Sequence, residues 1–391
     1  MRYVKLKRLS VFFYIDALDS SFLTGKTTPF MSNLGAKNFY RPLENVLGYS
    51  FAIQASMLSG KYPDENNHWM PYFYSPDSSF MLYNVLNKIG LAMPLDKLPV
   101  LRYLTVRQFK QVKKIPGVQA NNIPLKIINR FYQFPYYYMC DLPFYNQLSN
   151  NLRESDVSLK YIGPPEIRQN LYSRLLRYIA QSKNMNEVII VYDDKLDFIG
   201  HRFGPKSTEY SQYVKAVDKV LSKVYLNLKG KFGDALNFMI FSDHGQSQLS
   251  QSFDIMSQIK AGNLHFAEDY VCFVDATITM FWVRDNHAKR TLENILGNLK
   301  IGTLVNETMR EKYHLNFKNQ NLCGDLIFVT NPGCTFFPNY FSPFKPMKGL
   351  HGYMPETPVQ QAFLISDNFL DKRIRHVKDI KETLVRSALS W

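Results

Sequence analysis

The chain has 391 residues, of which 46% are hydrophobic, enough apolar material for one large or two modest folded domains. No apolar run approaches the roughly 20 residues of a membrane-spanning helix, and the run Val11–Ile15 is too short for a signal peptide, so we expect a cytoplasmic protein. The net charge of +14 is spread along the chain and favours anionic partners: phosphate esters, nucleic acids or the acidic lipids of a membrane surface. A basic surface that only aids solubility is the plain alternative.

Three apolar runs each end in acidic or imidazole side chains. In chain order they are residues 9–16, 188–194 and 236–245, and each has the short, continuously apolar character of a strand covered on both faces. Apolar residues at intervals of three and four predict amphipathic helices over 166–181 and over 207–231. This alternation of strands and helices predicts an α/β fold with a doubly wound, mostly parallel sheet and helices on both faces.

Two stretches of the chain lack this alternation. Residues 66–165 are rich in aromatic side chains and basic patches, and we interpret them as an inserted cap that covers the active edge of the sheet and selects the substrate. Residues 284–340 combine one helix-like segment with a loop-rich one, and they form a smaller predicted insertion within the core. The predicted catalytic core is therefore 1–65 together with 166–391.

The cysteines bear on metal binding and on the compartment. They lie far apart and form no CxxC pair, the four being Cys140, Cys272, Cys323 and Cys334. A zinc ribbon is therefore not expected, and free thiols in a reducing compartment are the simplest interpretation. The sequence leaves the oligomeric state open.

Carboxylates and histidines follow the predicted strands at the ends where a parallel sheet binds ligands. Asp197 and His201 are four residues apart, so a helical turn would bring both to one face. Six residues are candidates for one location: Asp16, Asp197, His201, Asp243, His244 and His351. Such oxygen and nitrogen ligands suit two divalent metal ions, with zinc favoured and manganese or iron as alternatives. Taken singly, a strand-end aspartate is more often a helix cap and a lone histidine more often structural.

The joint order of these motifs carries a resemblance to a known family. The segments "FYIDALDS", "TTPFMSNL", "GYSFAIQASMLSGKYPDENNH", "LDFIGHRFGP", "FSDHGQS" and "GLHGYMPE" are similar to the alkaline phosphatase superfamily, and most of all to its type I phosphodiesterase/nucleotide pyrophosphatase branch. They cover roughly residues 9–68 and 185–365 and leave the aromatic insertion unmatched. The resemblance implies an alkaline phosphatase-like fold with two metal sites, one formed by Asp197, His201 and His351 and the other by Asp16, Asp243 and His244. Asp193 and Asp194 fall outside the family pattern, and we expect them to cap a helix or to hydrogen-bond the ligand histidines.

The same resemblance assigns the nucleophile to Ser50, whose hydroxyl a bound metal would activate. The alternative is an ordinary loop or N-cap serine. The sequence departs from the family pattern three residues later, where Ile53 stands in place of an asparagine that contacts the phosphoryl oxygen. An apolar side chain cannot donate a hydrogen bond, so Gln54, a backbone N–H or a basic residue of the insertion is expected to substitute.

We therefore predict a two-metal phosphodiesterase that hydrolyses a phosphodiester or pyrophosphate-type bond through a phosphoseryl intermediate. The alternatives are a phosphomonoesterase or a phosphoryl or headgroup transferase on the same fold, and, less favoured, an inactive module that binds anions or nucleic acid. No specific nucleic-acid motif is found. A sulfatase is disfavoured because the residues after Ser50 lack the proline and arginine of the sulfatase element. The insertion offers four cations for an anionic substrate: Arg107, Lys110, Lys113 and Lys114.

Overall fold

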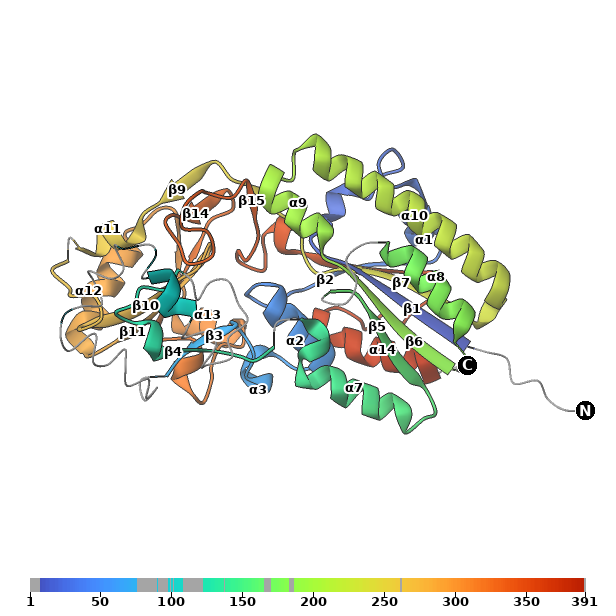
Figure 1. Ribbon diagram of the computed structural model, residues 1–391, viewed down its shortest axis with the longest axis horizontal. Helices are drawn as coiled ribbons and strands as arrows, with labels where there is room; N and C mark the ends of the chain where they lie inside the picture. Colours follow the sequence, from blue (N-terminus) through green and yellow to red (C-terminus); the bar gives the residue numbers. More distant parts are fainter. Residues whose placement is uncertain are drawn as a thin grey trace, which may run out of the picture.

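The computed structural model describes residues 8–75, 90, 98, 100, 102–107, 122–136, 138–164, 170–182, 186–260 and 262–389. Its central sheet has the strand order β2-β16-β7-β1-β6-β5 (Figure 1). The bounds of these strands are β1 Arg8–Ile15, β2 Phe39–Leu43, β5 Ser158–Ile162, β6 Asn186–Asp193, β7 Leu236–Ser242 and β16 Ala362–Ser366. β7, β1, β6 and β5 run parallel, whereas β16 is antiparallel to both β2 and β7. The predicted α/β fold with a mostly parallel sheet is confirmed.

Helices cover both faces of this sheet, which explains why its central strands are apolar throughout. Successive residues of β1 point to opposite faces, so Phe12 and Tyr14 join one core while Val11 and Phe13 join the other. The second of these cores also contains side chains of α1 (Pro29–Lys37), α8 (Leu171–Gln181) and α10 (Thr208–Phe232). The first contains side chains of α2 (Ser50–Ser59), α7 (Pro143–Arg153) and α14 (Ile380–Leu389).

The two predicted helices correspond to α8 and α10. α10 begins where the Ser207 hydroxyl accepts a hydrogen bond from the Tyr210 backbone N–H at 3.2 Å. It ends at Phe232, and Gly233 follows with a φ of 56°, a left-handed conformation that glycine adopts without steric cost.

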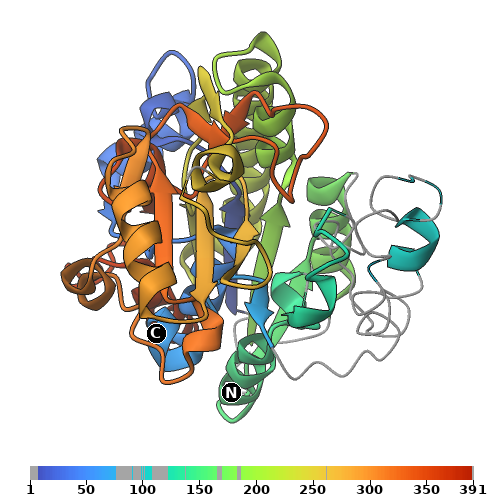
Figure 2. The same cartoon turned by 90° about the vertical axis from the view of Figure 1, so that its left-hand side faces the viewer.

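A second, antiparallel sheet lies beside the central one and has the order β10-β11-β13-β12. Its strands are β10 Tyr270–Val274, β11 Ile278–Val283, β12 Gly302–Leu304 and β13 Leu326–Thr330. Figure 2 shows this sheet in yellow and orange with α12 (Asn286–Gly297) alongside it. The smaller predicted insertion, 284–340, supplies β12 and β13 of this sheet, whereas β10 and β11 precede it in the chain.

The predicted cap, 66–165, packs on the second sheet and adds a strand to the central one. Its strands β3 (Tyr72–Tyr74) and β4 (Phe131–Gln133) are far apart in sequence but pair antiparallel, and Tyr72 stacks on Phe273 of the second sheet at 5.0 Å between ring centroids. α7 and β5 also fall within the predicted cap, yet they form part of the central layers. The division of the chain into core and cap therefore stays a prediction, and part of the predicted cap belongs to the same layers as the predicted core.

Two features of the described chain bear on its environment. All four cysteines are free thiols. Among the helices that the structure describes, none combines the length and the apolar character needed to cross a bilayer.

Candidate active site

The first candidate metal group lies at the carboxyl ends of two neighbouring strands. Asp16 directly follows β1, and Asp243 and His244 directly follow β7. Because β1 and β7 are parallel partners, their ends meet, and one ligand atom from each of the three residues lies within 4.8 Å of the others. The Nε2 atom of His244 is 3.2 Å from Asp243 Oδ2 and 3.6 Å from Asp16 Oδ1.

The second group combines a short helix with a distant loop. Asp197 and His201 belong to α9 (Lys195–Phe203), and their four-residue spacing places His201 Nε2 3.2 Å from Asp197 Oδ2. His351 follows β15 (Gly349–Leu350), and its Nε2 lies 3.4 Å from Asp197 Oδ1. Ligand atoms of these three residues also lie within 4.8 Å of one another.

The two groups adjoin. The imidazole of His244, from the first group, stacks on that of His351, from the second, with ring centroids 3.8 Å apart and planes inclined by 15°. The six residues proposed from the sequence are thus brought together as the two triplets that the resemblance implied.

Backbone carbonyls orient two of the imidazoles. His201 Nδ1 is 2.9 Å from the Gly349 carbonyl oxygen, and His244 Nδ1 is 2.9 Å from that of Gly245. A carbonyl can only accept, so both Nδ1 atoms donate, and both Nε2 atoms face the carboxylates. This is the arrangement that fits a metal-binding histidine.

Side chains that the sequence analysis did not single out hold the three carboxylates. The Tyr192 hydroxyl donates to Asp16, and the Tyr14 hydroxyl donates to Asp243 at 2.7 Å. Gln246 Nε2 donates to Asp197 Oδ1 at 2.6 Å and to the Asp197 backbone carbonyl at 3.0 Å. Tyr14 and Tyr192 looked like ordinary core residues of apolar runs, and only the position of Gln246 after the "SDHG" motif marked it.

The electrostatics fit divalent cations. Burial and the neighbouring Asp243 raise the pKa of Asp16 well above its usual range, and Asp16 Oδ1 is buried without a hydrogen-bond partner. Burial also acts to raise the pKa of Asp197, but the adjacent His201 outweighs it and holds that pKa well below the usual range. Burial and His244 lower the pKa of His351, which favours its neutral form. A bound cation would favour the ionised carboxylates and neutral imidazoles that ligate metals, and it would satisfy the unpartnered oxygen of Asp16.

Ser50 faces the first metal group. It is the first residue of α2, and its Oγ lies 3.0 Å from His244 Nε2. The hydroxyl therefore sits at the positive end of a helix dipole and beside the ligands of one metal, where a developing alkoxide would be stabilised. The other serines of this helix, Ser56 and Ser59, are buried in the core.

Gln54 lines the same cavity one helical turn after Ser50, whereas Ile53 is fully buried in the core. The Gln54 amide donates to the Tyr192 hydroxyl at 3.1 Å. Gln54 also hydrogen-bonds the Tyr14 side chain, so both tyrosines that hold the carboxylates of the first metal group contact this amide.

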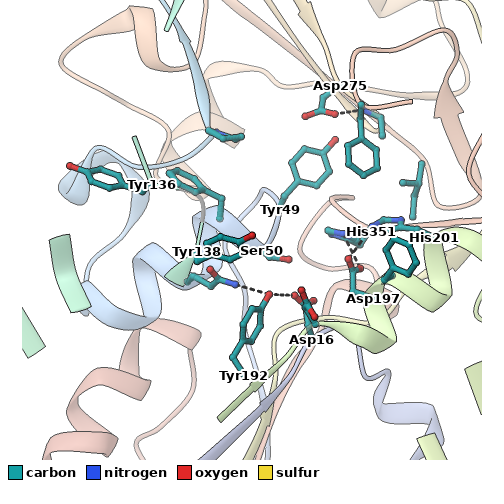
Figure 3. A pocket seen from close by; sticks show the side chains of 18 of the residues that line it. Asp16, Tyr49, Ser50, Tyr136, Tyr138, Tyr192, Asp197, His201, Asp275 and His351 are labelled. Carbon is teal, nitrogen blue, oxygen red and sulfur yellow. Dashed lines mark hydrogen bonds and ion pairs between the residues drawn. The ribbon is translucent and has the colours of Figure 1, made fainter. Parts of the chain in front are cut away.

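A cavity of about 690 Å³ opens between the two metal groups and the aromatic insertion. Figure 3 shows Tyr136 and Tyr138 on one side of it and His201 and His351 on the other, with Ser50 between them. The predicted cap contributes four lining residues: Pro71, Gln133, Tyr136 and Tyr138.

Asp275, which the sequence analysis missed, lines the wall of the cavity near Tyr49 (Figure 3). One of its oxygens accepts a hydrogen bond from the Ala276 backbone N–H at 2.8 Å. Burial raises the pKa of this carboxyl to about 7. It follows β10 at the end of an apolar run, so the strand-end pattern that identified Asp16 could have found it.

The other predicted polar residues lie apart from the metal groups. Asp193 accepts hydrogen bonds from the Tyr172 and Tyr213 hydroxyls and from the Lys195 backbone N–H at the start of α9, so it serves a cap-like role rather than contacting a ligand histidine. Asp194 occupies the N-cap position of α9 and lines the cavity. Of the four predicted substrate cations, Arg107 is exposed, while Lys110, Lys113 and Lys114 lie outside the described residues.

Comparisons with solved structures show the fold. The murine ectonucleotide pyrophosphatase/phosphodiesterase 5, as an inactive variant in complex with AMP, superposes with a TM-score of 0.68 at 15% identity, covering 98% of this chain and 95% of that one. The human ectonucleotide pyrophosphatase/phosphodiesterase 5 gives a TM-score of 0.64 at 15% identity, covering 97% and 93%.

Sequence comparisons find relatives of the same kind. Family member 7 of the ectonucleotide pyrophosphatases/phosphodiesterases from Rattus norvegicus is 24% identical over 216 residues, which are 54% of this chain and 44% of the relative. The chain thus matches less than half the length of this curated relative. The family model described as type I phosphodiesterase/nucleotide pyrophosphatase matches residues 10–354, which include all six residues of the metal groups and Ser50. By this match over most of its length, the chain belongs to the type I phosphodiesterase/nucleotide pyrophosphatase family.

Proposed function

We propose that this protein is a two-metal phosphodiesterase that cleaves a phosphodiester or pyrophosphate-type bond through a phosphoseryl intermediate. The observation that carries the proposal is the position of Ser50. Its Oγ lies 3.0 Å from His244 Nε2 and lines a cavity that both metal groups also line. A nucleophile, two sets of divalent-metal ligands and room for a substrate therefore meet at one point.

Two sets of residues would bind the metal ions, and Ser50 would act as the nucleophile. Asp16, Asp243 and His244 would hold one metal ion, and Asp197, His201 and His351 the other. When bound, the two ions supply charge that lowers the pKa of the nucleophile and stabilises the phosphoryl oxygens. Ser50 Oγ forms a bond to phosphorus as the bond to the leaving oxygen breaks, and water then releases the phosphoryl group from Ser50.

Gln54 and the first turn of α2 support the phosphoryl group in this proposal. Gln54 is anchored by Tyr192, which itself holds Asp16, so one chain of hydrogen bonds links the amide to the first metal group. An N–H donor at this place would replace the asparagine that the family pattern has at position 53.

The cavity has room for an organic group attached to the phosphate. A volume of about 690 Å³ is far more than a phosphate group fills, and it falls within the range of pockets for small organic ligands. The aromatic walls that the predicted cap supplies would receive the group attached to phosphorus, which supports a substrate-selecting role for residues 66–165. Zinc as the metal and a cytoplasmic location complete the proposal, and both remain predictions from the sequence.

The test compares chromogenic esters. Purified protein is assayed with bis(p-nitrophenyl) phosphate, p-nitrophenyl phosphate and p-nitrophenyl sulfate, before and after a chelator and after return of zinc, manganese or iron. We expect diester hydrolysis that the chelator abolishes and one metal restores best, together with two ions per chain by elemental analysis. Faster hydrolysis of the monoester would replace the proposal with a phosphomonoesterase. Full activity in metal-free protein would refute the mechanism.

A further inference from the structure

Two segments at the mouth of the cavity carry exposed side chains that the proposed chemistry does not use. They are residues 195–206, which contain α9, and residues 341–348, the loop before β15, and together we call them the mouth surface. Lys195 and Phe198 of the first and Phe341 of the second line the cavity. The segments are tied together by the Lys348 backbone N–H, which donates to the His201 carbonyl at 2.9 Å, and Figure 1 shows α9 beside β15.

The mouth surface exposes large apolar side chains. Among the residues that the structure describes, four phenylalanines are exposed, and three of them lie here: Phe198 at 64%, Phe203 at 40% and Phe344 at 93%. Ser342 Oγ donates to the Lys345 carbonyl at 2.6 Å, which closes the tip of the loop and leaves Phe344 outward. Three exposed aromatic rings on two adjoining segments favour an interaction site over ordinary surface.

Every exposed charge on the mouth surface is positive. Its exposed charged residues are Lys195, Arg202, Lys206, Lys345 and Lys348, and the single carboxylate of the two segments is the metal-group residue Asp197. Phenylalanines among lysines match the chemistry of an anionic membrane surface, where rings enter the headgroup boundary and cations pair with acidic lipids. Protein interfaces, by contrast, are depleted in lysine.

We propose that the mouth surface docks on an anionic lipid bilayer, with Phe344 inserted at the headgroup level and the five cations around it. This goes beyond the proposed catalysis, because a docked enzyme would open its cavity towards the membrane and so receive phosphate esters carried by lipids.

The test measures binding without turnover. Protein is sedimented with vesicles of phosphatidylcholine and phosphatidylserine, and in parallel with pure phosphatidylcholine vesicles. We expect binding to the mixed vesicles that weakens in pure phosphatidylcholine and at high salt. Phe344→Ser should weaken it about tenfold, through loss of one inserted ring, and Lys345→Gln about fivefold.

Phe369→Ser is the matched control. Phe369 is 81% exposed, but it follows β16 at the opposite end of the central sheet, between Asp367 and Asp371. This variant should bind as the wild type does, and all three should hydrolyse a soluble diester at the wild-type rate. The proposal is overturned if wild-type protein does not sediment with mixed vesicles, or if Phe369→Ser weakens binding as much as Phe344→Ser. It is also overturned if the two mouth variants impair capture of a protein or an oligonucleotide while vesicle binding stays unchanged. Failure of vesicle binding alone leaves the proposed hydrolysis standing.

Discussion

The substitution Gly200→Ala should weaken metal binding at the group of Asp197, His201 and His351, although it replaces none of these three ligands. A Cβ placed on Gly200 would lie 1.9 Å from Gln246 Oε1 and 2.5 Å from its Cδ, so the Gln246 side chain has to move. That side chain cannot move freely, since its Nε2 holds both the carboxylate and the backbone carbonyl of Asp197. Gly200→Ala therefore acts on Asp197 through Gln246.

The magnitude follows from the bonds that are lost. A hydrogen bond to a charged group contributes about 1.5–3 kcal/mol, and removing a residue that orients a metal ligand typically costs about 10- to 100-fold in metal affinity. Alanine is otherwise the better helix former by roughly 1 kcal/mol, so helix propensity alone would favour the variant. We expect a 10- to 100-fold loss of affinity at the Asp197 site and wild-type affinity at the Asp16 site.

The assay dialyses each variant to equilibrium against buffered zinc and then measures its metal content by elemental analysis. Gly230→Ala is the control, because Gly230 also lies within a helix but a Cβ there meets nothing within 4 Å. It should keep both ions and gain a little stability. The double variant Gly200→Ala/Gln246→Ala should lose no more affinity than Gln246→Ala alone, since both changes break the same contact. Wild-type affinity in Gly200→Ala, or additive losses in the double variant, would refute the reasoning.

Three further predictions address the nucleophile, the cavity wall and the insertion. Ser50→Ala should leave metal content and thermal unfolding unchanged but lower kcat by roughly a thousandfold or more; a wild-type rate would mean that another group attacks phosphorus. Burial raises the pKa of Asp275 to about 7, so the folded protein holds this proton more tightly than the unfolded chain, and stability falls as pH rises from about 4 to about 7. In chelator-treated protein, Asp275→Asn should remove that fall and be more stable above pH 7 by on the order of a few kcal/mol, as judged by urea unfolding at several pH values; parallel pH profiles would contradict it. The four proposed substrate cations are Arg107, Lys110, Lys113 and Lys114. Replacing all four with glutamine should raise KM for phosphodiesters at unchanged metal content. Unaltered kinetics would show that these cations do not bind the substrate.

The sequence was most informative where local pattern and chemistry coincide. Asp16 and Asp243 each end a continuously apolar run, and parallel strands that are buried on both faces bring such ends to one edge. The spacing of Asp197 and His201 is a local property of a helix, so it too could be predicted. The family resemblance supplied the pairing into two groups, which strand order alone does not determine.

Long-range partners could not be predicted. Tyr192 reads as one more apolar strand residue, and its bond to Asp16 joins positions 176 residues apart. The strand β2, with the sequence Phe-Tyr-Arg-Pro-Leu, has no continuous apolar pattern because it is an edge strand, where proline is tolerated. The strands β10 and β11 were missed because a tight turn joins two short apolar segments, a pattern that periodicity alone does not resolve.

The chain order of the metal groups determines when a metal ion can be captured during biosynthesis. The group of Asp16, Asp243 and His244 is complete once residue 244 has been made, but the second group lacks a ligand until His351 has been made. β16, which separates β2 from β7 in the sheet, is made later still. The chain up to His351 must therefore leave the ribosome before both sites exist. Since nitrogen and oxygen ligands bind copper more tightly than zinc, the metal that is incorporated depends on which ions are available where this last strand docks.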